Sequence, residues 1–171
     1  MTEPLIRLLT ENDAAIYREL RLQALTQTPQ AFISDFETER QKDINSFRYK
    51  LNISHQEPIW GYYGIFVQDK LAGICQLAPG YAPKMAHIAH FYSLYVDPKY
   101  RGQGLAKKLI AHVLTQLRAQ KIERLFISYL ARNRCVRGFY DKLGFTQCGL
   151  KPKAIKENDE YDDEVLMVLE L

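Results

Sequence analysis

The chain has 171 residues, of which 47% are hydrophobic, 25% are charged and 12% are aromatic, with a formal net charge of +3. At roughly 150 residues per domain this length predicts one domain, and a chain of this size buries about 70% of its unfolded surface without disulfides or metals. The aromatic content, together with only 9 glycines and 7 prolines, excludes a disordered, collagenous or low-complexity protein.

The first half of the chain alternates between strand and helix patterns. We predict a strand at residues 5–9, a helix carrying Ile16, Leu20 and Ala24 after a capping box at Thr10–Asp13, and a polar helix from about Phe36 to Ile53. Thr28-Pro29 ends the first of these helices. Residues 60–67 and 71–77 then predict two strands that are separated by a turn at residues 68–70.

The second half contains one strongly amphipathic helix among several strands. The predicted elements are a long strand at His87–Val96, a helix at Leu105–Leu117, a strand at Leu125–Ser128, a helix around Val136–Leu143, and strands at Phe145–Gly149 and Val165–Leu169. Gly144 follows the last helix, where a glycine commonly ends a helix. No repeat or linker interrupts the chain. The prediction is one α+β domain over residues 1–171, with a mixed, mainly antiparallel central sheet flanked by helices.

Cysteine usage and hydropathy indicate the compartment. Cys75, Cys135 and Cys148 are far apart and form no C-x-x-C pair, which favours reduced thiols over a disulfide framework or a zinc site. The first residues lack the basic and apolar segments of a signal peptide, and no apolar run approaches the roughly 20 residues of a membrane helix. We therefore expect a cytoplasmic protein with no metal and no membrane partner.

Positive charge is concentrated in one stretch of the chain. Lys99–Arg137 contains ten basic residues and one acid, Glu123, whereas the remainder has a net charge of −6 with six acids in Glu157–Glu164. The stretch is either a solvated basic face or a site for a polyanionic ligand, and the Gly-rich turn within it favours the ligand. Nucleic acid is a weaker alternative, because interleaved aromatic residues on which single strands could stack are missing.

The Gly-rich turn lies between a strand and a helix, within Tyr95–Ala106. The first N–H groups of a helix have no intrahelical acceptor and the helix dipole makes that end positive, while Gly102 and Gly104 let a ligand approach the backbone. This pattern predicts a phosphate or pyrophosphate cradle, although an ordinary helix start also explains two glycines. A Walker A loop and a dinucleotide fingerprint are both disfavoured, since Leu105 and Lys107 stand where those motifs require other residues.

Two segments carry the most information about function. Arg101–Ala106 has the sequence Arg-Gly-Gln-Gly-Leu-Ala, and Asn133–Phe145 has the sequence Asn-Arg-Cys-Val-Arg-Gly-Phe-Tyr-Asp-Lys-Leu-Gly-Phe. They resemble the two signatures of the GNAT superfamily of acyl-CoA-dependent N-acetyltransferases, R/Q-x-x-G-x-G/A and Asn-x-x-Ala-x-x-x-Tyr-x-x-x-Gly-Phe, with Val136 in place of the small Ala. The spacing between the segments and the order of elements also fit that family.

The resemblance implies an enzyme that uses acetyl-CoA as its co-substrate. It implies that backbone amides hold the CoA pyrophosphate, that the end of a strand pairs with the pantetheine amides and polarises the thioester carbonyl, and that Asn133 reaches the pantetheine or a nearby backbone group. The amides are those of Arg101, Gly102, Gln103, Gly104, Leu105 and Ala106, and the strand end is Leu94, Tyr95 and Val96. Tyr140 is implied as the acid that protonates the leaving thiolate. The alternatives are that Asn133 only caps a helix and that Tyr140 is only a core aromatic.

The catalytic base is left open by the sequence. The candidates are His87 and His90, which strand alternation places on opposite faces, and Glu37 and Glu39 at the start of the polar helix. A histidine titrates near neutral pH and suits a base, but each of these histidines can equally be structural.

Two acidic segments suggest which amine is acetylated. Asp35, Glu37 and Glu39 lie in the connection at Pro29–Glu39, and the run Glu157–Glu164 is expected in a loop before the final strand. If both segments border the acceptor site they favour a cationic amine, and otherwise they are solvated surface. Five aromatic residues are candidates for an apolar wall of that site or for the core: Phe32, Phe36, Tyr62, Tyr63 and Tyr92.

Three functions are therefore weighed. The first is an N-acetyltransferase that moves an acetyl group from acetyl-CoA to a primary amine by direct attack in a ternary complex. The second is an acyl-CoA-binding regulatory module without efficient catalysis, and the third is a nucleic-acid-binding domain. The Tyr140 hydroxyl favours the enzyme, because a binding module does not need it. We expect a small-molecule or peptide amine as acceptor, no nucleic-acid partner, and we leave a homodimer open.

Overall fold

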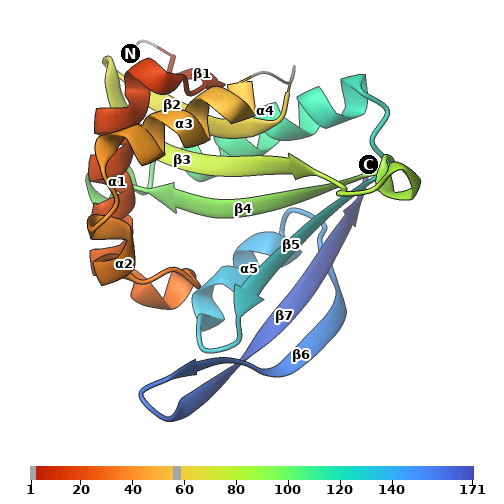
Figure 1. The fold of residues 1–171 in the computed structure, drawn as a ribbon. Coiled ribbons are helices and arrows are strands. Elements are labelled where there is room, and N and C mark those ends of the chain that lie inside the picture. Colours follow the sequence, from red (N-terminus) through yellow and green to blue (C-terminus); the bar gives the residue numbers. More distant parts are fainter. Residues whose placement is uncertain (1–2, 56–58) are drawn as a thin grey trace.

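A seven-stranded sheet with helices on both faces forms the centre of the computed structural model, which describes residues 3–55 and 59–171 (Figure 1). The strands are β1 (Leu5–Leu8), β2 (Gly61–Val67), β3 (Lys70–Pro79), β4 (Ile88–Val96), β5 (Arg124–Leu130), β6 (Thr146–Glu157) and β7 (Glu160–Glu170). Their order is β1-β2-β3-β4-β5-β7-β6, and only the β4–β5 pair is parallel. The predicted α+β class with a mainly antiparallel sheet is confirmed.

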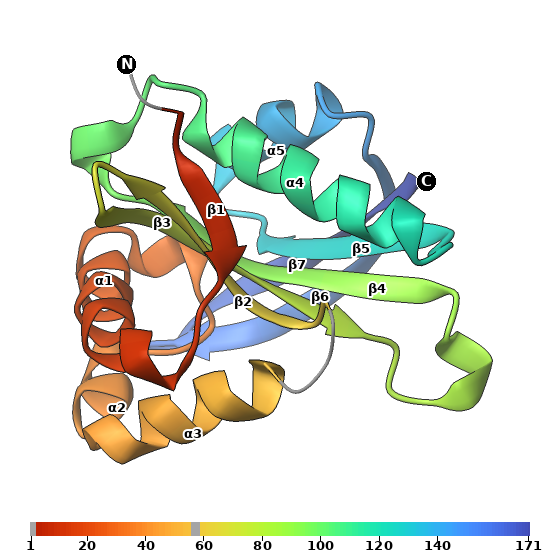
Figure 2. The ribbon, with the colours of Figure 1, turned by 90° about the horizontal axis from the view of Figure 1, so that it is seen from above.

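Helices cover both faces of this sheet (Figure 2), and a hydrophobic core lies beneath them on each face. The helices are α1 (Ala14–Gln27), α2 (Phe36–Arg40), α3 (Ile44–His55), α4 (Leu105–Ala119) and α5 (Arg134–Asp141). Leu109, Val113 and Leu117 repeat at helical spacing along α4 and are fully buried on one face of the sheet. On the other face, Tyr17 of α1 and Phe47 of α3 pack over β2, β3 and the end of β4.

The structure corrects two predicted elements. The polar helix predicted from about Phe36 to Ile53 is two helices, because the Asp43 carboxylate accepts a hydrogen bond from the Ser46 amide (2.8 Å) and starts a new helix. The prediction of a loop at Glu157–Glu164 is wrong, because β6 and β7 form a hairpin that includes these residues. Asn158 and Asp159 form its turn with φ of 49° and 62°, a conformation that Asn and Asp tolerate and that matches the twist of a hairpin.

The sheet divides where β4 and β5 separate. These parallel strands pair only over Ile88–Phe91 with Arg124–Ile127, whereas β4 remains paired with β3 up to Val96. A β-bulge in β4 accompanies the separation. Between the two positions at which β4 pairs with β3 on either side of the bulge, β4 contains both Ser93 and Leu94, and Ser93 has φ of +56°. The second half of β4 therefore presents a backbone edge without a strand partner to the opening between β4 and β5 (Figure 1).

Candidate active site

The turn before α4 presents a run of free backbone amides. Gly102 and Gly104 have φ of 78° and 74°, a region in which a Cβ atom is strained, and an added Cβ at either position would meet nothing within 4 Å. The Lys108 amide donates to the Gly104 carbonyl (3.0 Å), but among the described residues no acceptor is found for the amides of residues 102–107. Six free N–H groups at the positive end of a helix, beside open space, suit a phosphate group.

Arg101 has a different role from its neighbours in the signature. Its amide donates to the Pro98 carbonyl (3.3 Å), and its side-chain Nε donates to the Val96 carbonyl (3.0 Å). Its guanidinium also lies 5.6 Å from the centre of the Tyr95 ring. These contacts fix the turn to the end of β4, so the Arg101 amide is engaged within the chain.

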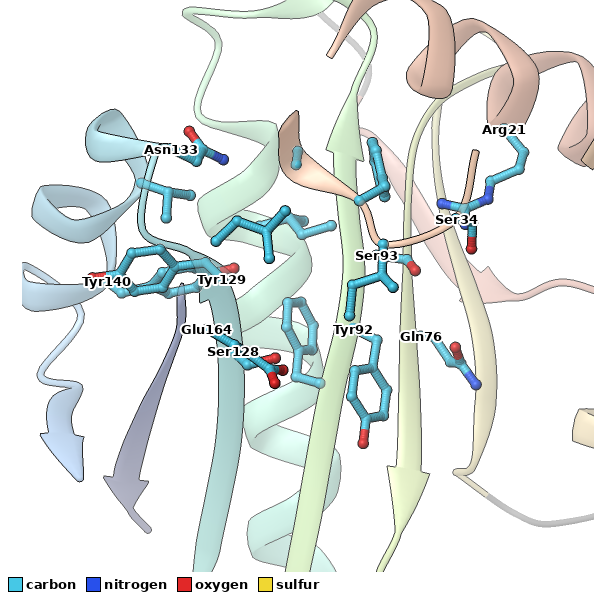
Figure 3. A pocket seen from close by; sticks show the side chains of 17 residues that line it. Arg21, Ser34, Gln76, Tyr92, Ser93, Ser128, Tyr129, Asn133, Tyr140 and Glu164 are labelled. Carbon is cyan, nitrogen blue, oxygen red and sulfur yellow. The ribbon is translucent and has the colours of Figure 1, made fainter. Parts of the chain in front are cut away.

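A cavity of about 270 Å³ occupies the opening between β4 and β5 (Figure 3). Its lining comes from α1, β3, β4, β5, α5, β7 and the segment before α2. The cavity brings together Leu94, Asn133 and Tyr140, three of the residues that the sequence predicted for the site. The Tyr95 side chain points away, into the core beside α1, where its hydroxyl donates to Gln27 (2.9 Å). Tyr95 and Val96 can therefore contribute only backbone groups.

Tyr140 is both a core aromatic and a cavity residue. It is 6% exposed, and its ring packs edge-on against Phe139 and Phe145 with ring centres 5.3 and 5.4 Å away. Burial raises the pKa of Tyr140 above its ordinary value, and the nearby Cys75 adds to that rise. The hydroxyl is therefore protonated at neutral pH and is able to donate its proton.

Asn133 occupies the N-cap position of α5, but its side chain does not cap the helix. Its backbone N–H donates to the Leu130 carbonyl (2.8 Å), while its side chain forms no capping hydrogen bond. The side-chain amide lies at the upper edge of the cavity in Figure 3. Its donor and acceptor groups are thus available to a ligand.

The four base candidates predicted from the sequence are absent from the lining of this cavity. His87 is exposed and precedes β4, and His90 stacks on the Tyr92 ring at 5.9 Å, where burial lowers the pKa of His90. Glu37 is exposed and paired within its own helix, and Glu39 is buried among cations beneath α1. The structure gives none of them direct access to a ligand in the cavity.

Glu164 of β7 is the acid that lines the cavity. It is 9% exposed, and its Oε2 lies 2.9 Å from the Lys151 Nζ (Figure 3 shows it beside Ser128). Burial raises the pKa of Glu164, but hydrogen bonds from Ser128 and Lys151 outweigh burial, so the pKa lies below its usual value. An ionised carboxylate in the cavity is able to accept a proton from an amine.

Sequence reasoning missed Glu164 as a separate residue because it belongs to the acidic run at the end of the chain. Strand alternation is the signal that could have singled it out. Val165 and Met167 are buried against α4 and α5, so Glu164 and Leu166 must point to the opposite face of the same strand. Arg21, Ser128 and Gln76 also line the cavity, and the sequence contained no comparable signal for them.

The two segments predicted to border the acceptor do face each other. Residues 29–36 and the β6–β7 hairpin line a second cavity of about 510 Å³. Its lining contains the acids Asp35, Glu157 and Asp162 but also the cations Arg132 and Lys156. The Arg132 Nε lies 2.8 Å from the Asp162 carboxylate. This wall therefore carries mixed charge rather than a free acidic surface.

A family model described as the acetyltransferase (GNAT) family matches residues 20–145. The chain belongs to the GNAT family. Both signature segments, Arg101–Ala106 and Asn133–Phe145, lie within the match, which confirms the resemblance found in the sequence.

Comparison with known proteins agrees with GNAT membership. The chain is 27% identical over 81 residues to the ribosomal protein bS18-alanine N-acetyltransferase of Escherichia coli K12, a match that covers 47% of this chain and 55% of that enzyme. The match thus spans about half the length of such curated relatives.

Two solved structures share the whole fold. A GNAT acetyltransferase from Streptococcus pneumoniae is 22% identical with a TM-score of 0.86 and covers 99% of this chain and 100% of its own. The protein yncA from Salmonella typhimurium, solved with its cofactor acetyl-CoA, is 18% identical with a TM-score of 0.83 and covers 99% of this chain and 95% of its own. At these identities the likeness concerns the fold.

Proposed function

We propose that this GNAT protein transfers an acetyl group from acetyl-CoA to a primary amine by direct attack in a ternary complex. The observation that carries the proposal is the cavity at the separated strands, which holds Tyr140 and Glu164 and lies at the unpaired edge of β4. The free amides of residues 102–107 belong to the turn before α4 and to its first residues, directly after this strand. Strand β4 thus borders the cavity with its acid–base pair and leads directly to the amides proposed to bind the donor.

The residues present fit acetyl-CoA, which supplies the acyl group as an activated thioester. The amides of residues 102–106 would hold its pyrophosphate in the open space beside Gly102 and Gly104. The edge at Leu94–Val96 would pair with its pantetheine amides as an added strand does, and Asn133 would bind the same arm. The net charge of +9 over Lys99–Arg137 favours a ligand that carries several phosphate charges.

Acetyl transfer to an amine requires the movement of two protons. Glu164 would accept a proton from the attacking amine, directly or through a water molecule, because its carboxylate is ionised and lines the cavity. Backbone N–H groups at the bulged edge near Leu94 would stabilise the carbonyl oxygen as the amine adds. Tyr140 would donate its proton to the departing sulfur.

Initial rates of thiol release test this function. Purified protein is mixed with acetyl-CoA and a panel of amines, and both substrates are varied for every amine that reacts. Direct attack in a ternary complex predicts intersecting double-reciprocal plots, whereas parallel plots would indicate an acetylated protein and overturn the mechanism. Tight CoA binding with no thiol release for any amine would favour the regulatory binding module instead.

The acceptor class is narrowed by one relative. The Escherichia coli relative acts, by its name, on an alanine of a ribosomal protein, which supports an amine carried by an amino acid or a peptide. A preference for an acceptor with a second positive charge and a cytoplasmic location stay predictions, and a homodimer stays open. In the part of the chain that the structure describes, no helix is long and apolar enough to cross a membrane.

A further inference from the structure

Arg21 of α1 is a buried cation, two of whose nitrogen atoms lack a hydrogen-bond partner among the described residues. The residue is 5% exposed, and within residues 3–55 and 59–171 its Nε and Nη1 atoms have no hydrogen-bond partner. A guanidinium is always charged and carries five N–H donors, and buried polar groups in folded proteins are nearly always paired. An arginine in this condition marks a place where an external acceptor would be stabilising.

The charges around Arg21 do not balance. Glu39 forms an ion pair with Arg21: its Oε1 lies 3.8 Å from the Arg21 Nε, too far for a hydrogen bond, and among the described residues this oxygen also has no hydrogen-bond partner. Glu39 also faces Lys42 at 2.7 Å and Lys50 at 3.6 Å. One carboxylate therefore serves three cations. Burial lowers the pKa of Lys50; the charge of Glu39 opposes this, and the charges of Arg21 and Lys42 add smaller contributions in the same direction as burial.

Arg21 faces the cavity proposed as the active site. It is part of the cavity lining, and Figure 3 shows its side chain reaching from α1 toward Ser34, on the other side of the Ser93 bulge from Glu164. The guanidinium carbon lies 4.7 Å from the centre of the Phe32 ring, which covers it with an apolar surface. A charged contact made under such cover is stronger than one made in open water.

We propose that Arg21 binds a carboxylate, or a similar small oxyanion, of the acceptor. The acceptor is then a small amino-carboxylate whose acid lies at Arg21 and whose amine lies toward Glu164. Guanidinium and carboxylate match in shape and can form two parallel hydrogen bonds. A cavity of about 270 Å³ suits a small molecule, and the surplus charge disfavours an acceptor with a second positive charge at this end. This inference rests on the proposed function and deepens it.

Matched acceptors test the inference with acetyl-CoA as donor. The twenty standard amino acids, their amides and the amines that lack the carboxyl group are compared by kcat/KM, with diamines as a further arm. For the best amino acid we expect kcat/KM to exceed that of its amide by about 10- to 100-fold, the range for a charge-assisted hydrogen bond. Arg21→Met should bring this ratio close to one, mainly by raising KM for the acid.

A second arginine of the same helix is the matched control. The Arg18 guanidinium donates to the Arg40 carbonyl (3.0 Å) and does not line the cavity. Arg18→Met should therefore leave the preference for the acid unchanged. Arg21→Lys keeps the charge but loses the paired donors, so it should retain only part of the preference, and it serves as the reporter if Arg21→Met fails to fold.

Three results would overturn the inference. The first is that amides, simple amines or diamines react as well as amino acids with the unaltered protein. The second is that Arg21→Met lowers kcat/KM for all acceptors by the same factor, which would indicate a structural role. The third is that no amino-carboxylate reacts. Failure of the proposed function is distinguished separately, because it would appear as absent CoA binding or as no thiol release with any amine.

Discussion

The cavity between β4 and β5 has two sides that are built differently. On the side proposed to bind acetyl-CoA, called the donor side and defined as residues 94–106, the available groups are backbone amides and the unpaired edge of one strand. On the side proposed to bind the amine, called the acceptor side and defined as Arg21, Ser34, Gln76, Tyr92 and Glu164, the available groups are side chains from α1, β3, β4, β7 and the segment before α2. The donor side thus occupies one continuous stretch of chain, whereas the acceptor side collects single residues from across the fold.

This difference predicts how each side responds to substitution. A backbone site needs particular φ values and open space, so it is sensitive where glycines stand and tolerant elsewhere. A side-chain site depends on the charge and reach of each residue, so a single substitution alters one step of the reaction. Tyr140 and Asn133 of the α5 segment lie between the two sides. Their variants test whether each residue contributes to CoA binding, to turnover or to both.

Removal of the Tyr140 hydroxyl should have the largest effect. Tyr140→Phe keeps the ring packed against Phe139 and Phe145, and should lower kcat by roughly 10- to 1,000-fold with little change in CoA affinity or Tm. Tyr129, a half-buried tyrosine that also lines the cavity, is the matched control, and Tyr129→Phe should leave kcat within a few-fold. Unchanged turnover of Tyr140→Phe, with chemistry rate-limiting, would remove Tyr140 from the mechanism.

A side chain at Gly104 tests the backbone character of the donor side. Gly104→Val should weaken CoA binding by about 100-fold in calorimetry, because φ is +74° and the new methyl groups would fill the open space beside the amides. Gly138→Ala is the control, since Gly138 lies in α5 with open space around it and no left-handed φ. A folded Gly104→Val protein that binds CoA as tightly as the parent would show that the pyrophosphate lies elsewhere.

Neutralisation of Glu164 tests the side-chain character of the acceptor side. Glu164→Gln should lower kcat/KM for the amine by about 10- to 100-fold while CoA affinity stays near that of the parent. An equal loss of CoA affinity would contradict the separation into two sides.

The pH profile should connect Glu164 to its partner Lys151. Because the pKa of Glu164 lies below its usual value, its carboxylate stays ionised to lower pH. The acid limb of the pH profile of kcat/KM should therefore lie at a pH below about 4.3, the ordinary pKa of a glutamate. Lys151→Met removes a cation that favours ionisation, so the pKa of Glu164 should rise and the acid limb should move to higher pH. Lys153→Met is the control, since the Lys153 Nζ lies over the Tyr161 ring at 5.2 Å. An unmoved acid limb in Lys151→Met would exclude Glu164 as the base.

Asn133→Ala should have the smallest effect. Since its side chain makes no capping hydrogen bond, the free energy of unfolding should change by less than ~0.5 kcal/mol, and CoA affinity should fall only a few-fold. Asp35→Ala is the contrasting variant, because the Asp35 carboxylate does accept from the Thr38 amide at the start of α2 (2.8 Å), and its Tm should fall further. A larger loss of stability for Asn133→Ala than for Asp35→Ala would restore the helix-cap interpretation of Asn133.

Local patterns predicted most of the fold. The helix at Leu105–Leu117 and the strand at His87–Val96 appear within a residue or two of the expected positions, because period and flanking glycine or proline act over a few residues. The errors lie where local signals compete. Asp43 caps a second helix inside an apparently continuous one. The charged run at Glu157–Glu164 lacks the apolar alternation of a strand, although most of it pairs within the hairpin on either side of the turn at Asn158 and Asp159.

By itself, the sequence determined the order of the elements and which residues are proposed for the donor side, because the turn at residues 102–106 is a local pattern of neighbouring residues. The segment of Asn133 and Tyr140, between the two sides, is likewise local. Only the tertiary structure decided the acceptor side. Arg21 and Glu164 are 143 positions apart in the sequence and line one cavity because β4 separates from β5 and leaves room between α1 and β7. The lowered pKa of Glu164 follows from hydrogen bonds with partners on other strands, and the unpaired donors of Arg21 follow from where the fold buries them. Such effects have no local signature in a sequence.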